Sequence, residues 1–296
     1  MPSGILILHK EGGMTSHTAV ARVRKLFGLE KAGHTGTLDP MATGVLPVLL
    51  GRAVKASAFV TDADKHYIAT LRLGITTDTE DITGTVLSQT DALPTAEKVV
   101  EVARRFVGAL LQTPPMYSAL KVGGKKLVDL AREGKEVPRE PRPVTVYRLD
   151  VTPLDSGEYT LDVVCSKGTY IRTLCADIGA ALGCGGVMTS LCRAEAAGFS
   201  LAEAHTLSEL EAMTEEERLS LLVPVEHLFR HLPAVRVEEF YARLLRHGQR
   251  PAKRKLKINY PAGTRLRLVD ANGFFALGEI PEEDPDAVRT VTLFVL

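Results

Sequence analysis

The 296-residue sequence has no apolar run approaching the roughly 20 residues that a membrane-spanning helix needs. Residues 1–10 also lack the basic region and the long apolar segment of a signal peptide. The short apolar run Gly4–Leu8 is instead typical of a first β-strand. These absences exclude a membrane partner and predict a cytoplasmic protein.

Tryptophan is absent and cysteine is scarce. The four cysteines, Cys165, Cys175, Cys184 and Cys192, show no C-x-x-C spacing and lie in apolar stretches. We therefore expect buried free thiols of a reducing compartment and no metal site. Without tryptophan, tyrosine and histidine must supply any planar group that stacks on a ligand.

The sequence has no net charge, with 36 Lys and Arg residues against 36 Asp and Glu residues. This balance argues against a uniformly basic nucleic-acid binder, but the charges are segregated. From Arg243 to Arg267 there are nine Lys or Arg residues and no Asp or Glu, whereas Glu195 to Glu239 holds ten acidic and three basic residues. A solvated face would explain either run. Contact with phosphates is the leading explanation of the basic one.

Apolar periodicity predicts strands and helices without a regular β–α–β alternation. The alternation that starts at Lys65 indicates a half-buried strand with Tyr67 on its inner face. Further strands are expected at residues 144–151, 159–165 and 187–193, and helices at 16–27, 95–107 and 169–182, the first capped by Ser16 and the last ended by Gly183. The sequence therefore predicts an α+β fold with a mixed, largely antiparallel sheet and flanking helices.

Two segments differ in composition from the rest. Residues 113–143 contain a Pro-Pro pair, Gly-Gly-Lys-Lys and surplus positive charge, which predict an excursion from the sheet with a short helix at 126–132. Beyond residue 230, strand-like runs at 265–269, 274–280 and 291–296 indicate a small β-rich domain. We expect one large domain over residues 1–230 and a second over 231–296.

The densest group of chemically informative residues runs from Gly33 to Gly44. Its three glycines permit positive φ or close backbone approach, and Pro40 restricts Asp39 to an extended conformation. An aspartate held in this way can present its carboxylate in one orientation, as a catalytic group needs. It can equally close an Asx turn on nearby backbone amides. Nucleotide binding is weakly supported, because the Walker lysine and the G-x-G-x-x-G spacing are missing.

The pattern His-x-Gly-x-Leu-Asp-Pro-x-Ala-x-Gly in this loop resembles the signature of the TruB family of tRNA pseudouridine synthases, in its bacterial form. Other family motifs are matched in order by Lys10–Ser16, Lys65-x-Tyr67, Thr113–Lys121, Gly168–Leu174 and Leu191–Arg193. The chain departs from the family at Glu11, where proline is usual, and at Cys192, where arginine is common. Neither residue touches the expected chemistry.

The resemblance implies a pseudouridine synthase fold and a reaction on the uridine in the T-loop of tRNA. The C1′–N1 bond breaks, the base turns, and it rejoins the sugar through C5. No atom is gained or lost, so no cofactor is implied. The expected partner is tRNA, and the chain is expected to act as a monomer.

The resemblance also implies roles for catalytic residues. Asp39 matches the catalytic aspartate, which acts as a nucleophile toward sugar or base, or removes a sugar proton; the sequence leaves these routes open. Tyr67 matches the tyrosine that stacks on the target base and helps to remove the C5 proton. Arg172 matches the arginine that pairs with the aspartate, keeps it ionised and fixes its direction.

Three more matched residues are expected to bind the substrate. Tyr170 and Leu191 match pocket residues beside the flipped nucleotide. His34 matches the histidine that enters the T-loop and fills the space of the extruded nucleotide, which offsets part of the cost of flipping. Without the resemblance, Tyr67 and Leu191 would be core residues and Arg172 a helix-surface residue.

The resemblance weakens toward the C-terminus. Residues Arg246–Gln249 and Ala276–Glu279 look like the ends of a PUA-type RNA-binding module, which implies contact with the acceptor stem of tRNA. A merely structural β-domain is the alternative. The large domain is then the catalytic domain, residues 1–230, with a thumb-like insertion at about 113–143, and residues 231–296 are a PUA-like RNA-binding domain.

Two other functions stay open. The first is a catalytically silent RNA-binding or RNA-chaperone protein on the same fold, against which the joint presence of Asp39, Tyr67 and Arg172 argues. The second is a synthase that modifies ribosomal or small nuclear RNA under guide direction. The thumb-like insertion and the modest C-terminal domain favour the stand-alone tRNA enzyme.

Overall fold

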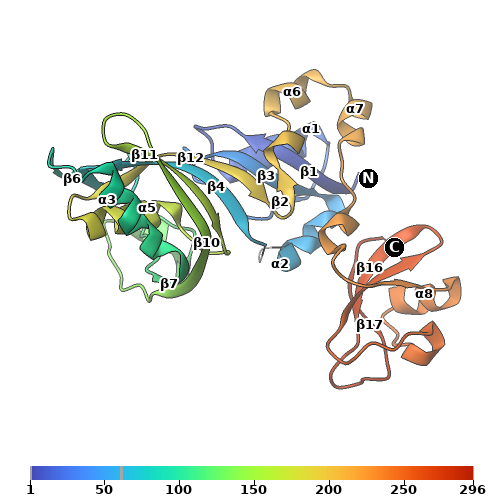
Figure 1. Ribbon diagram of the computed structural model, residues 1–296. Coiled ribbons are helices and arrows are strands. Elements are labelled where there is room, and N and C mark those ends of the chain that lie inside the picture. Colours follow the sequence, from blue (N-terminus) through green and yellow to red (C-terminus); the bar gives the residue numbers. More distant parts are fainter. Residues whose placement is uncertain (1, 61–62, 296) are drawn as a thin grey trace.

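The computed structural model describes residues 2–60 and 63–295. It contains a large mixed sheet and a small sheet, both flanked by helices (Figure 1). The large sheet contains β1 Gly4–Lys10, β2 Ala32–His34, β3 Thr43–Leu50, β4 Lys65–Leu73, β7 Gly108–Gln112, β10 Arg142–Pro153, β11 Glu158–Cys165, β12 Gly186–Ala196 and β13 Phe199–Ser200. Its main spatial order is β1–β3–β12–β4–β11–β10–β7, with β2 beside β3 and β13 beside β12. Among the described strands of this large sheet only β3 and β12 pair in parallel, so the predicted α+β class with a largely antiparallel sheet is confirmed.

Helices cover the two halves of this sheet separately. The helices of this part of the molecule are α1 Ser16–Leu26, α2 Ser57–Val60, α3 Ala96–Ala103, α4 Leu127–Arg132, α5 Ile171–Leu182, α6 Leu207–Ala212 and α7 Glu215–Ser220, whereas α8 Glu239–Arg246 packs on the small sheet. In Figure 1, α3 and α5 lie together near β10 and β7, while α1, α6 and α7 gather at the β1 end. Gly183 ends α5 in the left-handed conformation, as predicted.

Three predicted boundaries were wrong. Ser16 does not cap α1, because the Thr15 hydroxyl accepts the backbone N–H of Thr18 at 3.0 Å and Ser16 is the first helical residue. The helix predicted at 95–107 ends at Ala103 and continues as a 3-10 turn. The last predicted strand is β17 Arg289–Leu293, and residue 296 lies outside the described residues.

Strands β1 and β3 are apolar on both faces because each side of the sheet carries a core. Leu6 and Leu8 enter the main core, which also holds Val23 of α1. Ile5 and Ile7 enter a second cluster on the opposite face. The uninterrupted run Ile-Leu-Ile-Leu therefore reflects burial on two sides, whereas β4 and β11, half covered, alternate.

The small sheet has the order β14–β15–β16–β17, with β14 Ala234–Arg236, β15 Arg265–Asp270 and β16 Gly273–Glu279. It packs directly on the large sheet's second cluster. The Phe229 ring lies 6.1 Å from that of Phe59, 6.0 Å from Phe274 and 5.6 Å from Phe294, between ring centroids. The two parts thus share a core, and their division at residue 231 stays a prediction.

Residues 113–143 leave the large sheet after β7 and return in β10. They contain the short hairpin of β8 Lys121–Val122 and β9 Lys125–Lys126, followed by the predicted short helix, α4. A second excursion was not predicted: β5 Ile75–Thr77 and β6 Val86–Gln89 pair with each other. The turn between them, residues 78–85, reaches the site described next.

Candidate active site

Asp39 lies in the connection between β2 and β3, outside any helix or strand. Ser16 fixes the residue before it: the Ser16 hydroxyl donates to the Leu38 carbonyl at 3.0 Å and accepts the Leu38 N–H at 2.8 Å. Ser16 is 1% exposed, so these bonds are shielded from water. The start of α1 therefore holds the backbone that carries the carboxylate.

Two buried cations hold the rest of this loop. The Lys10 ammonium donates to the carbonyls of Ala42 at 2.6 Å and Pro40 at 3.2 Å. The Arg193 guanidinium donates to the carbonyls of Val45 at 2.8 Å and Gly36 at 3.0 Å. Burial lowers the pKa of Lys10 to about 8, against the opposing charge of Asp39.

Gly44 is required where the loop joins β3. It has a φ of +108°, and a Cβ there would lie 2.3 Å from the carbonyl oxygen of Arg193 on the parallel neighbour β12. No side chain fits at that distance. Of the three glycines expected to need special conformations, Gly33 and Gly36 have no positive φ.

The Asp39 carboxylate is paired in two-point geometry with Arg172, from the first turn of α5. Nε of Arg172 lies 2.9 Å from Oδ2 of Asp39, and Nη2 donates to Oδ1 at 3.2 Å. Arg172 is buried, with 5% of its side chain exposed, while Asp39 keeps 33%. An Asx turn on neighbouring amides is not seen for this carboxylate in the described residues. Its open side faces the cavity described below.

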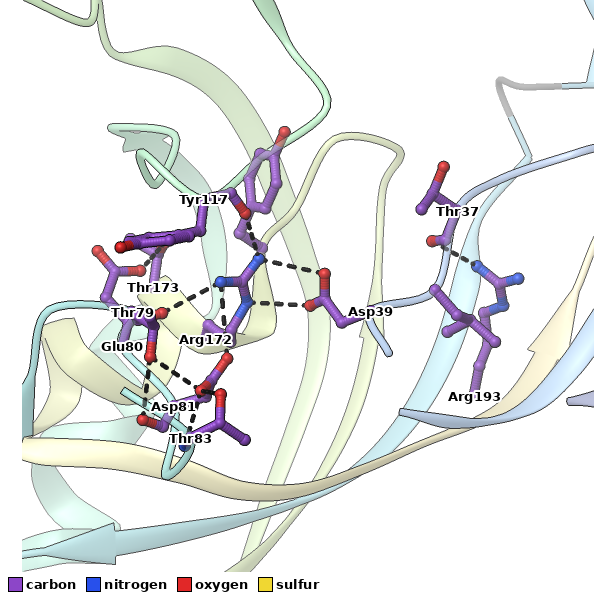
Figure 2. A network of polar contacts seen from close by, with 12 residues as sticks. Thr37, Asp39, Thr79, Glu80, Asp81, Thr83, Tyr117, Arg172, Thr173 and Arg193 are labelled. Atoms are coloured by element: carbon purple, nitrogen blue, oxygen red, sulfur yellow. Dashed lines mark hydrogen bonds and ion pairs between the residues drawn. The ribbon is translucent and has the colours of Figure 1, made fainter. Parts of the chain in front are cut away.

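The same guanidinium is fixed from behind by two other segments. Nη1 donates to the Thr79 carbonyl at 3.1 Å, and Nη2 donates to the Tyr117 carbonyl at 2.8 Å. Asp81, in the 78–85 turn, approaches Nη1 at 3.7 Å and is itself held by Thr83. Figure 2 shows Arg172 between Asp39 on one side and Thr79 with Asp81 on the other.

Burial raises the pKa of Asp39 above the ordinary value of an aspartate, and the charge of Arg172 opposes this while that of Asp81 adds to it. The pairing with Arg172 therefore favours the ionised form, but burial has the larger effect on the pKa of Asp39. If the carboxylate must be ionised to act, activity is present above this raised pKa and is lost as pH falls through it.

Asp81→Asn should therefore move the acid limb of the pH–rate profile to lower pH, because it removes a negative charge that raises the pKa of Asp39. The measurement is the single-turnover rate at saturating RNA across the acidic range. Asp162→Asn, which removes a carboxylate paired with His66 and Arg148 elsewhere on the sheet, is the control. An acid limb that stays in place or moves upward in Asp81→Asn would contradict the argument.

Five of the six residues singled out from the sequence line one cavity of about 310 Å³: Asp39, Tyr67, Tyr170, Arg172 and Leu191. This volume lies at the lower end of ligand pockets, which measure about 300–1,000 Å³. The sixth, His34, lines an adjoining cavity of about 900 Å³ that shares Asp39 and Arg172 with the first. Both cavities are bounded by residues 118–119 of the excursion.

The aromatic residues of the two cavities are held firmly. Tyr67 is 8% exposed on β4, and burial raises its pKa. The backbone of Tyr170 is bonded twice by the buried Gln112 side chain, which accepts its N–H at 2.7 Å and donates to its carbonyl at 3.0 Å. The His34 Nδ1 accepts the N–H of Gly36 at 3.3 Å, and burial lowers the pKa of His34, which favours the neutral ring.

Sequence reasoning missed four residues that build this site: Lys10, Asp81, Gln112 and Arg193. Lys10 and Arg193 lay in matched motifs, and a charged residue inside an apolar strand was the available signal. Asp81, within Thr-x-Asp-x-Thr, and Gln112 carried no comparable signal.

The cysteines and helices add two observations. Cys165, Cys175 and Cys184 are buried free thiols, while Cys192 is partly exposed. In the part of the chain that the structure describes, no three His, Cys, Asp or Glu side chains are grouped so that they could hold a metal ion. None of the helices in residues 2–60 and 63–295 combines the length and apolar character of a membrane span.

A fixed carboxylate–guanidinium pair therefore opens into a cavity on a mixed sheet that is large enough for a nucleoside, an arrangement typical of an enzyme site. Residues 24–171 match the family model of the TruB family pseudouridylate synthase N-terminal domain, and residues 172–230 match that of the tRNA pseudouridylate synthase B C-terminal domain. The chain belongs to the TruB family of pseudouridylate synthases.

Similar proteins cover nearly the whole chain. The tRNA pseudouridine synthase B of Dechloromonas aromatica is 48% identical over 278 residues, which is 93% of this chain and 91% of that protein. That of Alkaliphilus oremlandii is 43% identical over 284 residues, 95% and 94% of the two chains. Among solved structures, a Cbf5-Nop10-Gar1 complex matches with a TM-score of 0.74 at 27% identity, covering 99% of this chain and 85% of the other. The predicted pseudouridine synthase fold is therefore confirmed.

Proposed function

We propose that this enzyme isomerises the T-loop uridine of tRNA to pseudouridine, with Asp39 as the catalytic carboxylate. The observation that carries the proposal is the two-point contact of Asp39 with Arg172 at the wall of a cavity large enough for one nucleoside. Relatives named tRNA pseudouridine synthase B, at 41–48% identity, support tRNA as the substrate.

The proposed chemistry needs a carboxylate held in one direction. As the C1′–N1 bond breaks, its electron pair leaves with the base, and Asp39 either bonds to the electron-poor carbon or removes a sugar proton. The base then turns and C5 bonds to C1′, which displaces Asp39 from that carbon or is accompanied by return of the sugar proton from Asp39. The C5 proton then leaves and N1 gains a proton. The atoms balance without a cofactor. Arg172 aims the carboxylate and Tyr67, on the same cavity wall, stacks on the base and assists at C5.

The other cavity residues are assigned to binding. Leu191 and Tyr170 pack against the flipped nucleotide in the small cavity. His34 lies in the larger cavity, which we assign to the T-arm, and its neutral ring replaces the flipped base in the stack. Both cavities are built within one chain, so a monomer suffices. A tRNA substrate supports a cytoplasmic location.

The test is to incubate the purified chain alone with unmodified tRNA and to map pseudouridine by position. We expect a single modified uridine, in the T-loop. A second candidate is a guide-directed synthase, since one structural neighbour is an H/ACA RNP bound to a substrate RNA, at 25% identity and a TM-score of 0.71. Modification only after a guide RNA is added would favour it. Binding without any modification would favour a silent RNA-binding protein.

Residues 231–296 are proposed to act as a PUA-like RNA-binding domain that contacts the acceptor stem. Of the nine basic residues between positions 243 and 267, ion pairs engage Arg246, Arg250, Lys253 and Arg267. The exposed side chains of Arg254, Lys255 and Lys257 have no Asp or Glu partner in the described part of the chain. Arg243 and Arg265 are also exposed without such a partner, and Arg265 lies over the Phe59 ring, but only Arg254, Lys255 and Lys257 are grouped within four positions, so these three are the main candidates for phosphate contact.

Replacing Arg254, Lys255 and Lys257 by Gln should weaken binding of full-length tRNA and flatten its salt dependence. The log–log slope should fall by about one for each phosphate that the variant no longer touches. Single-turnover chemistry on a T-arm hairpin, which lacks the acceptor stem, should change little. Lys98→Gln on α3, combined with Arg105→Gln in the 3-10 turn that follows it, controls for the removal of positive charge. An unchanged salt slope in the triple variant would refute the phosphate contacts.

A further inference from the structure

Arg193 is the largest fully buried side chain of the described residues, with 1% exposure. No Asp or Glu lies within 4.0 Å of its guanidinium in the described residues, so it forms no ion pair there. Its hydrogen bonds go to neutral carbonyls, those of Val45, Gly36 and, at 3.5 Å, Thr37. A buried charge without a counter-charge is costly. The charge itself therefore calls for an explanation.

The position of Arg193 supplies one. It lies opposite Tyr67 in the pairing of β12 with β4 and lines the small cavity. Figure 2 shows it on the far side of Asp39 from Arg172, beside Thr37. Its charge lowers the pKa of Tyr67, against the effect of burial. It also lowers the pKa of His34 and of Lys10, in the same direction as burial. Its charge therefore acts at the wall of the small cavity and on the residues beside it.

The lining of the small cavity is strongly unbalanced in charge. Arg172, Arg193, Lys65 and Lys167 line it with positive charge, while Asp39 is the one acidic residue among the described residues that line it. Arg172 is neutralised by Asp39 and Asp81. Arg193 is fixed by the loop and by the sheet, so its charge is held in place before the reaction begins. A site of this kind suits a ligand that becomes negative.

We propose that Arg193 stabilises the negative charge that uracil carries between cleavage of the C1′–N1 bond and formation of the C1′–C5 bond. On cleavage, the bonding pair leaves with N1 and spreads over O2 and O4 of the ring. The pair at C5 then forms the new bond to C1′, the C5 proton is lost and N1 is protonated. This inference rests on the proposed isomerisation. It adds a residue that acts on the detached base, whereas Asp39 and Arg172 act at the sugar.

The buried position strengthens this role. A fixed charge in a site shielded from water is worth far more than one in solvent, and it needs no reorganisation when the charge on the base develops. Lys10 already holds the loop from the other side through Ala42 and Pro40. Anchoring the loop therefore does not by itself require a second buried cation.

The test compares Arg193→Gln, which keeps N–H donors but loses the charge, with Arg193→Lys, which keeps the charge but loses the planar fork. Single-turnover rates are measured at saturating tRNA. We expect Arg193→Gln to lose on the order of 10²-fold in rate, with RNA affinity nearly unchanged, and Arg193→Lys to lose several-fold less. Arg148→Gln, on the exposed part of β10 beside Asp162, is the matched control and should behave like the wild type.

A second substrate separates charge stabilisation from loop anchoring. When 5-fluorouridine stands at the target position, its fluorine withdraws electrons and so stabilises the base anion without the help of Arg193. The rate of C1′–N1 cleavage, followed as loss of 5-fluorouridine from digested RNA, should then suffer several-fold less from Arg193→Gln than it does with uridine. A structural role would slow both substrates equally.

The inference is overturned if the deficit of Arg193→Gln is the same on both substrates, or if Arg193→Lys is as impaired as Arg193→Gln. Should Arg193→Gln fail to fold, Arg193→Lys decides: a rate within about tenfold of the wild type supports the charge, and a larger loss that is equal on both substrates refutes it. Failure of the proposed function is distinguishable, because the wild-type chain would then form no pseudouridine in tRNA at all.

Discussion

Asp39→Asn should abolish pseudouridine formation while tRNA binding and folding persist. Asparagine keeps the shape of the side chain and can still accept a bond from Arg172, but it cannot act as a nucleophile or as a base at the sugar. We expect a loss of at least about 10⁴-fold in single-turnover rate. The fold should survive because Asp39 is the partly exposed member of the pair and Asp81 remains near the guanidinium.

The measurement is pseudouridine formed per enzyme under single-turnover conditions, with tRNA affinity and thermal unfolding recorded in parallel. Asp39→Ala should behave like Asp39→Asn, since both lack the charge. Turnover of either variant within tenfold of the wild type would end the assignment of Asp39 as the catalytic carboxylate.

Arg172→Lys should also be severely impaired, by at least about 10²-fold in rate. One guanidinium bonds both oxygens of Asp39 and the carbonyls of Thr79 and Tyr117. A lysine ammonium is a single point and cannot reach these groups together. The carboxylate would lose its fixed direction, and buried carbonyls would lose their donor, at a cost of about 1–3 kcal/mol in stability.

Arg218→Lys provides a matched control, because Arg218 likewise donates to two backbone carbonyls, those of Leu210 and Met213, but far from the cavities. The control should lose some stability and keep its rate. If Arg172→Lys does the same, the contact between Arg172 and Asp39 serves the fold and not the reaction.

Local patterns predicted the elements that are half covered. The alternation in β4 and β11 follows directly from one buried and one open face, so their bounds were nearly right. The bounds of α1 and α3 were wrong by one to a few residues, because Thr15 competes with Ser16 for the cap and because a 3-10 turn extends α3. The β5–β6 hairpin was missed because its strands have only three and four residues, and the exposed Val86–Gln89 shows no alternation of apolar and polar residues.

The site was only partly predictable for another reason. Asp39 could be found because its loop has a distinctive local sequence. Its contact with Arg172 spans 133 residues, and that of Arg193 with Gly36 spans 157, so no local pattern reveals them. Arg172 was identified in the sequence only through the resemblance to a family. Arg193 and Lys10 bond backbone carbonyls, which carry no residue identity, and therefore only the folded chain shows what they hold.

The aromatic contacts between the two sheets have a consequence for substrate choice. Phe59, Phe229, Phe274 and Phe294 join the sheets through packed rings and not through a tether, so the basic surface of residues 254–257 stands at a set distance from the catalytic cavity. Under the proposed function, this fixed distance selects RNA substrates by the length of their stem. An RNA whose stem is lengthened or shortened by a few base pairs can reach the cavity or the basic surface, but it cannot reach both at once.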